Sequence, residues 1–190
     1  MNKIFLSLSF YTLLFLANVL ALPHALAQGY SYTDPAPKGV PVTSIVQIGP
    51  MNTTNFDVTI TLLETVRGKQ ALERLQTASA DVKAAKAGYE YLLARIRFAL
   101  QGRAVSDIGS FELGDSPFQW IAYSSDLRQY ESITVTPPNP ALQGPARSGE
   151  AVEGWVVFAV EQKEREPMMT FDPSSGGATG LGNILFFELY

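Results

Sequence analysis

The chain contains no cysteine, and its only histidine is His24. Without cysteine, disulfide bonds, thiolate metal sites and cysteine nucleophiles are excluded. His24 lies in the N-terminal segment that export would remove, so a Ser–His–Asp triad is excluded from the mature chain as well. The fold must therefore be stabilised by its hydrophobic core alone, which a chain of about 160 residues can supply.

Charged residues are few, at 17% of the chain, and no run of lysine or arginine occurs. The net charge of −4 lacks the basic excess of a nucleic-acid-binding protein. A polybasic segment that would attract anionic lipids is absent too. We therefore expect no nucleic acid partner, and the 46% content of hydrophobic residues argues against disorder.

The N-terminus has the three parts of a secretory signal peptide. Lys3 supplies the positive charge, residues 4–22 carry none, and residues 25–27 (Ala-Leu-Ala) form a small-x-small cleavage site. We expect cleavage after Ala27, which predicts a secreted or periplasmic protein. The uncharged run is also long enough to span a bilayer, so its retention as an anchor stays open, and only then would the protein meet a membrane.

The mature chain would begin at Gln28 and carry 13 basic and 18 acidic residues, a net charge of −5. Residues 28–38 are polar and rich in proline, which predicts a flexible leader before a single domain over 39–190.

Most of the remaining patterned segments have the length and β-branched composition of strands, separated by turn residues. The predicted strands are 40–49, 56–66, 117–125, 152–162, 168–173 and 184–190. The segment 152–162 is almost continuously apolar, which predicts a central strand covered on both faces. Residues 69–79 have helical spacing and predict one short helix, while the four prolines within 133–150 predict loop or edge structure.

The segment KAGYEYLLARIRFALQG, residues 86–102, fits both a helix and a strand. Its composition favours a helix, whereas Leu92, Ala94, Ile96, Phe98 and Leu100 alternate with more polar residues, as in a strand. A strand is the more economical interpretation among so many strands, and it directs these five side chains to the core. The sequence as a whole then predicts an all-β, immunoglobulin-like β-sandwich with one short helix between two strands.

Three stretches in order carry a resemblance to a known family. They are ETVRGKQAL at 64–72, GYEYLLARIRF at 88–98 and SGEAVEGWVVFAV at 148–160, followed by a short element at 169–173. The chain resembles the DUF4352 family, a bacterial domain of unknown function that is similar in fold to secreted, immunoglobulin-like mycobacterial antigens. The resemblance implies fold and export, and no reaction. The chain departs from the family in lacking a lipid-attachment cysteine and in longer loops at 136–149 and 174–183.

Candidate catalytic chemistry is sparse. The acids Asp107, Glu112, Asp115 and Asp126 lie in turn-rich sequence and could serve as a carboxylate pair or Ca²⁺ ligands, but exposed loop acids are the simpler interpretation. No S-x-x-K pair, EF-hand loop or G-K-[ST] phosphate loop occurs. We predict no catalytic, cofactor-binding or metal-binding residues, no cofactor, and a chain that is not an enzyme.

Aromatic residues offer the remaining candidates for binding. Tyr91, Trp155 and Phe158 have core spacing, and the sandwich core is also favoured for Phe118 and Trp120. If Phe118 and Trp120 were exposed, they could stack on sugars or anchor a partner. The main hypothesis is a non-catalytic, exported module that presents loops or an edge strand to a protein partner. The alternatives are an envelope protein that binds a glycan or metal ion, or a weak carboxylate-dependent hydrolase with two acids beside Trp120, and, if the anchor is retained, a membrane-tethered envelope factor.

Overall fold

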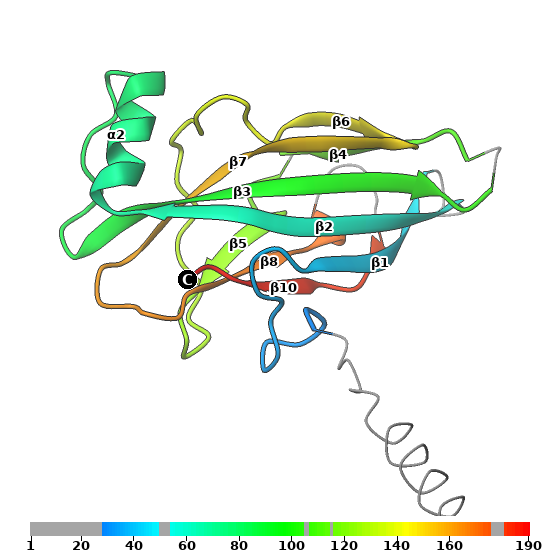
Figure 1. Ribbon diagram of the computed structural model, residues 1–190, viewed down its shortest axis with the longest axis horizontal. Coiled ribbons are helices and arrows are strands. Elements are labelled where there is room, and N and C mark those ends of the chain that lie inside the picture. Colours follow the sequence, from blue (N-terminus) through cyan, green and yellow to red (C-terminus); the bar gives the residue numbers. More distant parts are fainter. Residues whose placement is uncertain (1–27, 50–53, 105–106, 115, 176–180) are drawn as a thin grey trace, which may run out of the picture.

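A computed structural model describes residues 28–49, 54–104, 107–114, 116–175 and 181–190 (Figure 1). The predicted signal peptide and most of the glycine-rich loop lie outside these residues. The described chain is an all-β sandwich with one short helix between two strands, so the predicted fold class is confirmed.

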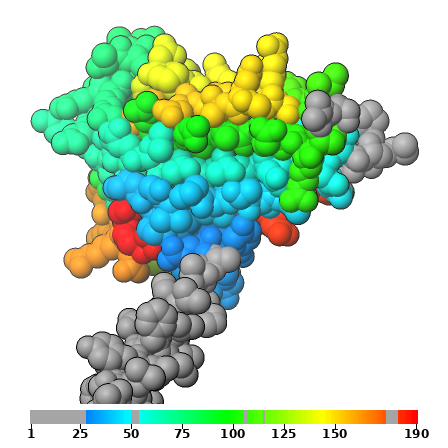
Figure 2. Space-filling view, turned by 45° about the vertical axis from the view of Figure 1, so that its right-hand side comes forward, coloured from blue at the N-terminus to red at the C-terminus, as the bar shows by residue number. Residues whose placement is uncertain are grey.

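One layer of the sandwich is a five-stranded antiparallel sheet. Its strands are β1 (Pro41–Ile48), β2 (Thr54–Arg67), β3 (Tyr89–Gly102), β7 (Glu150–Glu161) and β9 (Leu181–Gly182), in the spatial order β7-β3-β2-β1-β9. Figure 2 shows the outer face of this sheet, with β1 in blue, β2 in cyan and β3 in green.

The second layer is built from shorter strands. β5 (Trp120–Tyr123), β8 (Met168–Phe171) and β10 (Leu185–Glu188) form a three-stranded sheet in the order β10-β8-β5, and β4 (Ser110–Leu113) pairs with β6 (Gly144–Arg147). A 3-10 turn, η2, covers Pro173–Ser175. Pro145 is accommodated in β6 because this strand lies at the edge of its pair, where a missing N–H is tolerated.

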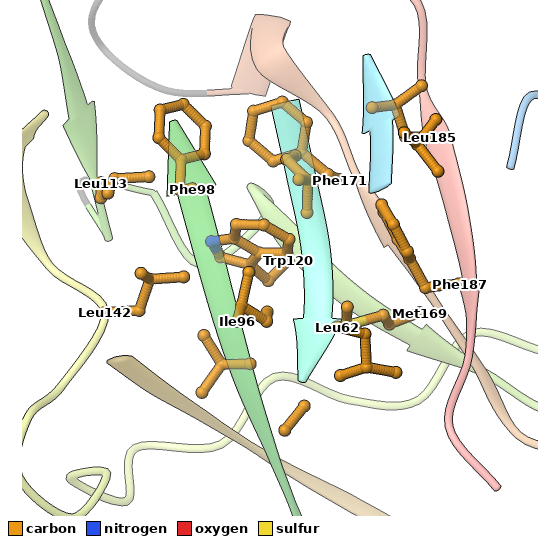
Figure 3. Packing of buried hydrophobic residues seen from close by; sticks show 14 of the residues in the cluster. Leu62, Ile96, Phe98, Leu113, Trp120, Leu142, Met169, Phe171, Leu185 and Phe187 are labelled. Carbon is orange, nitrogen blue, oxygen red and sulfur yellow. The ribbon is translucent and has the colours of Figure 1, made fainter. Parts of the chain in front are cut away.

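Residues 89–102 form strand β3, as the alternating interpretation predicted. Leu92, Ala94, Ile96, Phe98 and Leu100 are all buried between the layers. In Figure 3, Phe98 and Ile96 meet Phe171 and Trp120 from the opposite layer. Phe98 packs against Phe171 at 5.7 Å between ring centroids, and Trp120 against Phe171 at 4.8 Å. Aromatic contacts at these separations dominate the buried area of the core.

The helix α2 (Lys69–Ala78) covers part of the outer face of the large sheet. Ala71 and Leu75 are its buried residues. They belong to an outer cluster, defined as Val66, Ala71, Leu75, Tyr91, Leu93 and Trp155. The predicted burial of Tyr91 and Trp155 is thus confirmed, although both lie in this outer cluster, whereas Phe158 lies in the sandwich core.

The segment predicted as a flexible leader is instead attached to the sandwich. The Ala36 N–H donates to the Phe186 carbonyl at 2.9 Å, and the Glu188 N–H donates to the Ala36 carbonyl at 2.9 Å. The Phe186 N–H donates to the carbonyl of Gly29. Ala36 is completely buried, because these peptide hydrogen bonds draw the segment against β10. The polar composition that suggested a leader does not count backbone pairing of this kind.

β7, which contains the segment predicted as a central strand, lies at the edge of the large sheet. Both of its faces are covered, as its apolar run predicted. Val156, Phe158 and Val160 face the sandwich core, and Trp155 and Val157 pack with the outer cluster. An apolar run reports coverage of the two faces and carries no information about the neighbouring strand. The prediction of a central position was wrong for this reason.

Candidate functional site

The free edge of β7 is closed at one point by the chain that leads to β6. The Trp155 N–H donates to the Pro140 carbonyl at 2.8 Å, and the Trp155 carbonyl accepts from the Leu142 N–H at 3.0 Å. Both peptide groups of Trp155 therefore point away from β3. In an antiparallel strand, the direction of these groups repeats every second residue.

Val157 and Ala159 have the same phase as Trp155, so their peptide groups also point away from β3. They face Leu93 and Tyr91 across the β3–β7 ladder as non-hydrogen-bonded pairs. Among the residues that the structure describes, the outward N–H and C=O of Val157 and Ala159 have no hydrogen-bond partner. We call residues 157–159 the edge window.

The far end of the edge window is bounded by an ionic network. Arg128 contacts the Glu161 carboxylate at 3.2 Å and the Asp126 carboxylate at 2.9 Å. The Arg67 guanidinium donates to the Glu161 carbonyl at 2.8 Å. These contacts fix the end of β7, so the open part of the edge is short and has two defined limits.

A strap, defined as residues 131–142, runs past the edge window without pairing with it. Within the described chain, no backbone hydrogen bond involves residues 131–139. The strap is attached by its side chains, because Ile133 and Val135 pack against the outer cluster. Its prolines at 137, 138 and 140 have no N–H to offer a sheet.

A groove of about 490 Å³ lies between the end of β3, the end of β7 and the strap. Tyr89, Tyr91 and Tyr130 line it together with Ile133 and Ala159 of the edge window. The rings of Tyr89 and Tyr130 meet edge to face at 6.3 Å. Three tyrosines supply apolar area and polar tips in one place, which is typical of protein-binding surfaces.

A second cavity of about 200 Å³ continues from the groove and shares Tyr130, Glu131 and Ile133 with it. We call it the Trp120 cavity. Trp120 and Leu142 line it, and Val156 and Phe158 of β7 complete its apolar walls. Trp120 is 8% exposed, and its indole nitrogen has no hydrogen-bond partner.

The Tyr130 hydroxyl is also buried without a hydrogen bond of good geometry, although the peptide N–H of Glu161 lies close to it. Burial raises the pKa of Tyr130 above its ordinary value of 10.0, and this effect exceeds the opposing influence of the Glu161 N–H. The phenol is therefore protonated at neutral pH and can donate a hydrogen bond as well as accept one.

The predicted acidic candidates do not gather beside Trp120. Asp107 accepts a hydrogen bond from the Ala104 N–H, Glu112 lies in β4, and Asp126 pairs with Arg128. None of these three lines the Trp120 cavity, and Asp115 lies outside the described residues. The described part of the chain also holds no cluster of three or more His, Cys, Asp or Glu suited to a metal ion.

The two aromatic candidates near β5 separate. Trp120 is buried in the core, as favoured, whereas Phe118 is 55% exposed, so its predicted burial was wrong. Phe118 precedes β5, in a turn where the Phe118 N–H donates to the Ser116 hydroxyl, and the alternation of the strand does not extend to it. The aromatic pair therefore does not form one binding surface.

Sequence reasoning missed the edge window and the tyrosines of the groove. Tyr89 and Tyr130 flank predicted turns and follow no periodic pattern. The only available signal was the run of prolines after Val135, which marks a segment that cannot complete a sheet beside an apolar strand.

Comparisons with known proteins add little to this geometry. No family model and no curated protein matches the sequence. The crystal structure of the yjhA protein from Bacillus subtilis aligns with 78% of this chain and 97% of its own, at 12% identity and a TM-score of 0.45. That of ycdA from the same organism, provisionally assigned as a lipoprotein, aligns with 67% of this chain and 35% of its own, at 12% identity and a TM-score of 0.39. Likenesses this weak carry no argument about binding or activity.

No helix formed by the described residues has the length and apolar character needed to cross a membrane.

Proposed function

We propose that this chain is an exported, non-catalytic, immunoglobulin-like module that binds an extended segment of another protein along the edge of β7. The observation that carries the proposal is the edge window, in which the peptide groups of Val157 and Ala159 have no partner in the described chain and border a tyrosine-lined groove. The signal peptide and the resemblance to the DUF4352 family support export from a bacterial cell.

An extended segment is the occupant whose chemistry fits this edge. Unpaired N–H and C=O groups at a sheet edge are satisfied by the main chain of an added strand, and pockets beside the edge then select its side chains. The groove offers apolar and tyrosine surface at this position, so both requirements are met by neighbouring residues. No cofactor is needed for such binding.

A second copy of this chain fits the edge less well than a separate segment. β7 has 12 residues, whereas its open part ends at Trp155, where the strap is bound, and at Glu161, where Arg128 is bound. Pairing two long β7 strands would require both straps to be displaced. A flexible segment of three to five residues, by contrast, can enter between these limits.

The proposal is tested by selecting extended peptides from a random library against protein produced from the full sequence. Ala159→Pro removes the outward N–H at the centre of the window, and Ala151→Pro is its matched control. Ala151 has the same phase in β7 and is exposed, and it does not line the groove. An interface hydrogen bond contributes about 0.5–1.5 kcal/mol, and the proline ring also obstructs the added strand. We expect Ala159→Pro to weaken selected peptides by about tenfold or more, equal to about 1.4 kcal/mol, and Ala151→Pro by less than about twofold.

Two results would contradict the proposal. One is that no peptide is selected by the folded protein, or that the selected peptides bind both proline variants equally well. The other is a dimer in solution that Ala159→Pro dissociates, because it would assign the edge to a second copy. Selection of sugars or metal ions instead would favour the ligand-binding alternative.

A further inference from the structure

The Trp120 cavity has a feature that the edge window alone does not explain. The indole N–H of Trp120 is a hydrogen-bond donor with no acceptor, although the side chain is more than nine-tenths buried. In Figure 3, the nitrogen lies on the side of the ring that faces Leu142, a residue of the cavity wall. A buried donor without an acceptor costs free energy, and a bound oxygen atom in the cavity would remove that cost.

From this we infer that the Trp120 cavity is the anchor subsite of the β7 edge, and that it takes a neutral aromatic side chain carrying an oxygen, namely a tyrosine of the bound segment. The inference rests on the proposed function, because the cavity opens into the groove beside the edge window through Tyr130, Glu131 and Ile133. A residue of an added strand would reach the cavity from that side.

The walls of the cavity define the class of the ligand group. Leu142, Val156 and Phe158 are apolar, and Glu131 is the one charged residue among the described residues of the lining. A carboxylate would be repelled by Glu131 and would meet no cation there, so the oxygen must belong to a neutral group. An apolar cavity of about 150 Å³ holds one benzene ring, and the Trp120 cavity of about 200 Å³ therefore has room for a phenol.

The Tyr130 hydroxyl extends the same argument. It lines the cavity, has no hydrogen bond of good geometry, and stays protonated at neutral pH because burial raises the pKa of Tyr130. It can accept from, or donate to, a polar group of the bound segment. A tyrosine anchor thus finds a donor in Trp120 and a second polar contact at the entrance to the groove.

The test uses p-cresol as a probe of the tyrosine side chain and toluene as the same ring without oxygen. The chain has two tryptophans, Trp120 and Trp155, so their indole N–H signals in a ¹H–¹⁵N NMR spectrum provide the reporter and an internal reference. We expect p-cresol to shift the Trp120 signal in a saturable manner and to leave the Trp155 signal nearly unchanged. Trp120→Phe should weaken p-cresol binding at least about fivefold and toluene binding less than about twofold, whereas Trp155→Phe should change neither by more than about twofold.

Absence of a saturable shift at Trp120, equal affinity for p-cresol and toluene, or equal p-cresol affinity of wild type and Trp120→Phe would overturn the inference. The shift in the wild-type protein decides the matter if Trp120→Phe does not fold. The two proposals fail separately. Peptides that depend on Ala159 but carry no tyrosine would leave strand addition standing and contradict the anchor, while p-cresol binding without any selected peptide would do the reverse.

Discussion

At the scale of single residues, Gly154 lets the strap approach β7. A Cβ atom at this position would lie 2.5 Å from the Leu142 backbone nitrogen and 2.6 Å from the Ala141 carbonyl carbon. Neither backbone atom can move without breaking the two hydrogen bonds of Trp155. Glycine is therefore required by close approach, and the edge window begins where this contact ends.

The first prediction follows from that contact. Gly154→Ala should lower the free energy of unfolding by about 1–3 kcal/mol, the usual cost of overpacking a buried position. Chemical denaturation measures it, with Ala151→Gly as an exposed control on the same strand, expected to cost less than about 1 kcal/mol. Equal stability of Gly154→Ala and wild type would mean that the strap is not held against β7 as described.

A second residue-scale prediction concerns Asp126. The Ser124 hydroxyl donates to its carboxylate at 2.5 Å and Arg128 Nε donates at 2.9 Å. The hydrogen bond from Ser124, and then that from Arg128, lowers the pKa of Asp126 below its ordinary value of 3.8. A carboxyl with a lower pKa in the folded state stabilises the fold above its unfolded pKa, and this contribution is lost as the pH falls through the folded pKa.

NMR titration of the Asp126 carboxyl should therefore give a pKa below 3.8. Ser124→Ala should raise that pKa, and Asp126→Asn should make the loss of stability below about pH 4 less steep. An unchanged pKa in Ser124→Ala would contradict the assigned hydrogen bond.

At the scale of elements, α2 stabilises the outer face of the large sheet. Leu75 is completely buried in the outer cluster, whereas Leu72, on the same helix, is only partly buried beside it. Leu75→Ala should cost about 2–4 kcal/mol of unfolding free energy, because it leaves a cavity, and Leu72→Ala about half as much or less. Denaturation of the pair measures the difference, and equal costs would contradict the packing of α2.

The N-terminal segment is a second element whose role can be tested. Ala36→Asp buries a carboxylate without a partner next to β10 and should cost at least about 2 kcal/mol. Lys38→Asp makes a charge change two residues away at an exposed position and should cost less than about 0.5 kcal/mol. If both variants were as stable as wild type, residues 28–38 would be the flexible leader that the composition suggests.

The elements that could be predicted from the sequence are those with a clear period. The alternation in 89–102 identified β3 and its buried face, because side chains on a strand alternate between its two sides. The position of β7 could not be predicted, since Trp155 and Val157 are apolar for contacts with α2 and the strap, which are distant in sequence or aperiodic. The edge window was inaccessible for the same reason, because it consists of peptide groups whose partners are decided by the order of strands.

At the scale of the whole molecule, the sandwich keeps an unpaired edge without offering a long one. Unprotected edge strands promote aggregation, and proteins limit them with charges, prolines and covering loops. All three devices surround the edge window, as the Arg128–Glu161 pair, the prolines of the strap and the strap itself. What remains open is short, which suits a specific segment better than indiscriminate pairing.

The central claim is that a bound segment pairs with the backbone of β7. Residue-resolved amide hydrogen exchange, measured with and without a selected peptide, tests it most directly. Val157 and Ala159 should exchange fast in the free protein and be strongly protected in the complex, with little change at Val156 and Phe158, which are already paired with β3. Protection of Val157 and Ala159 in the free protein, or binding without any new protection there, would contradict the account.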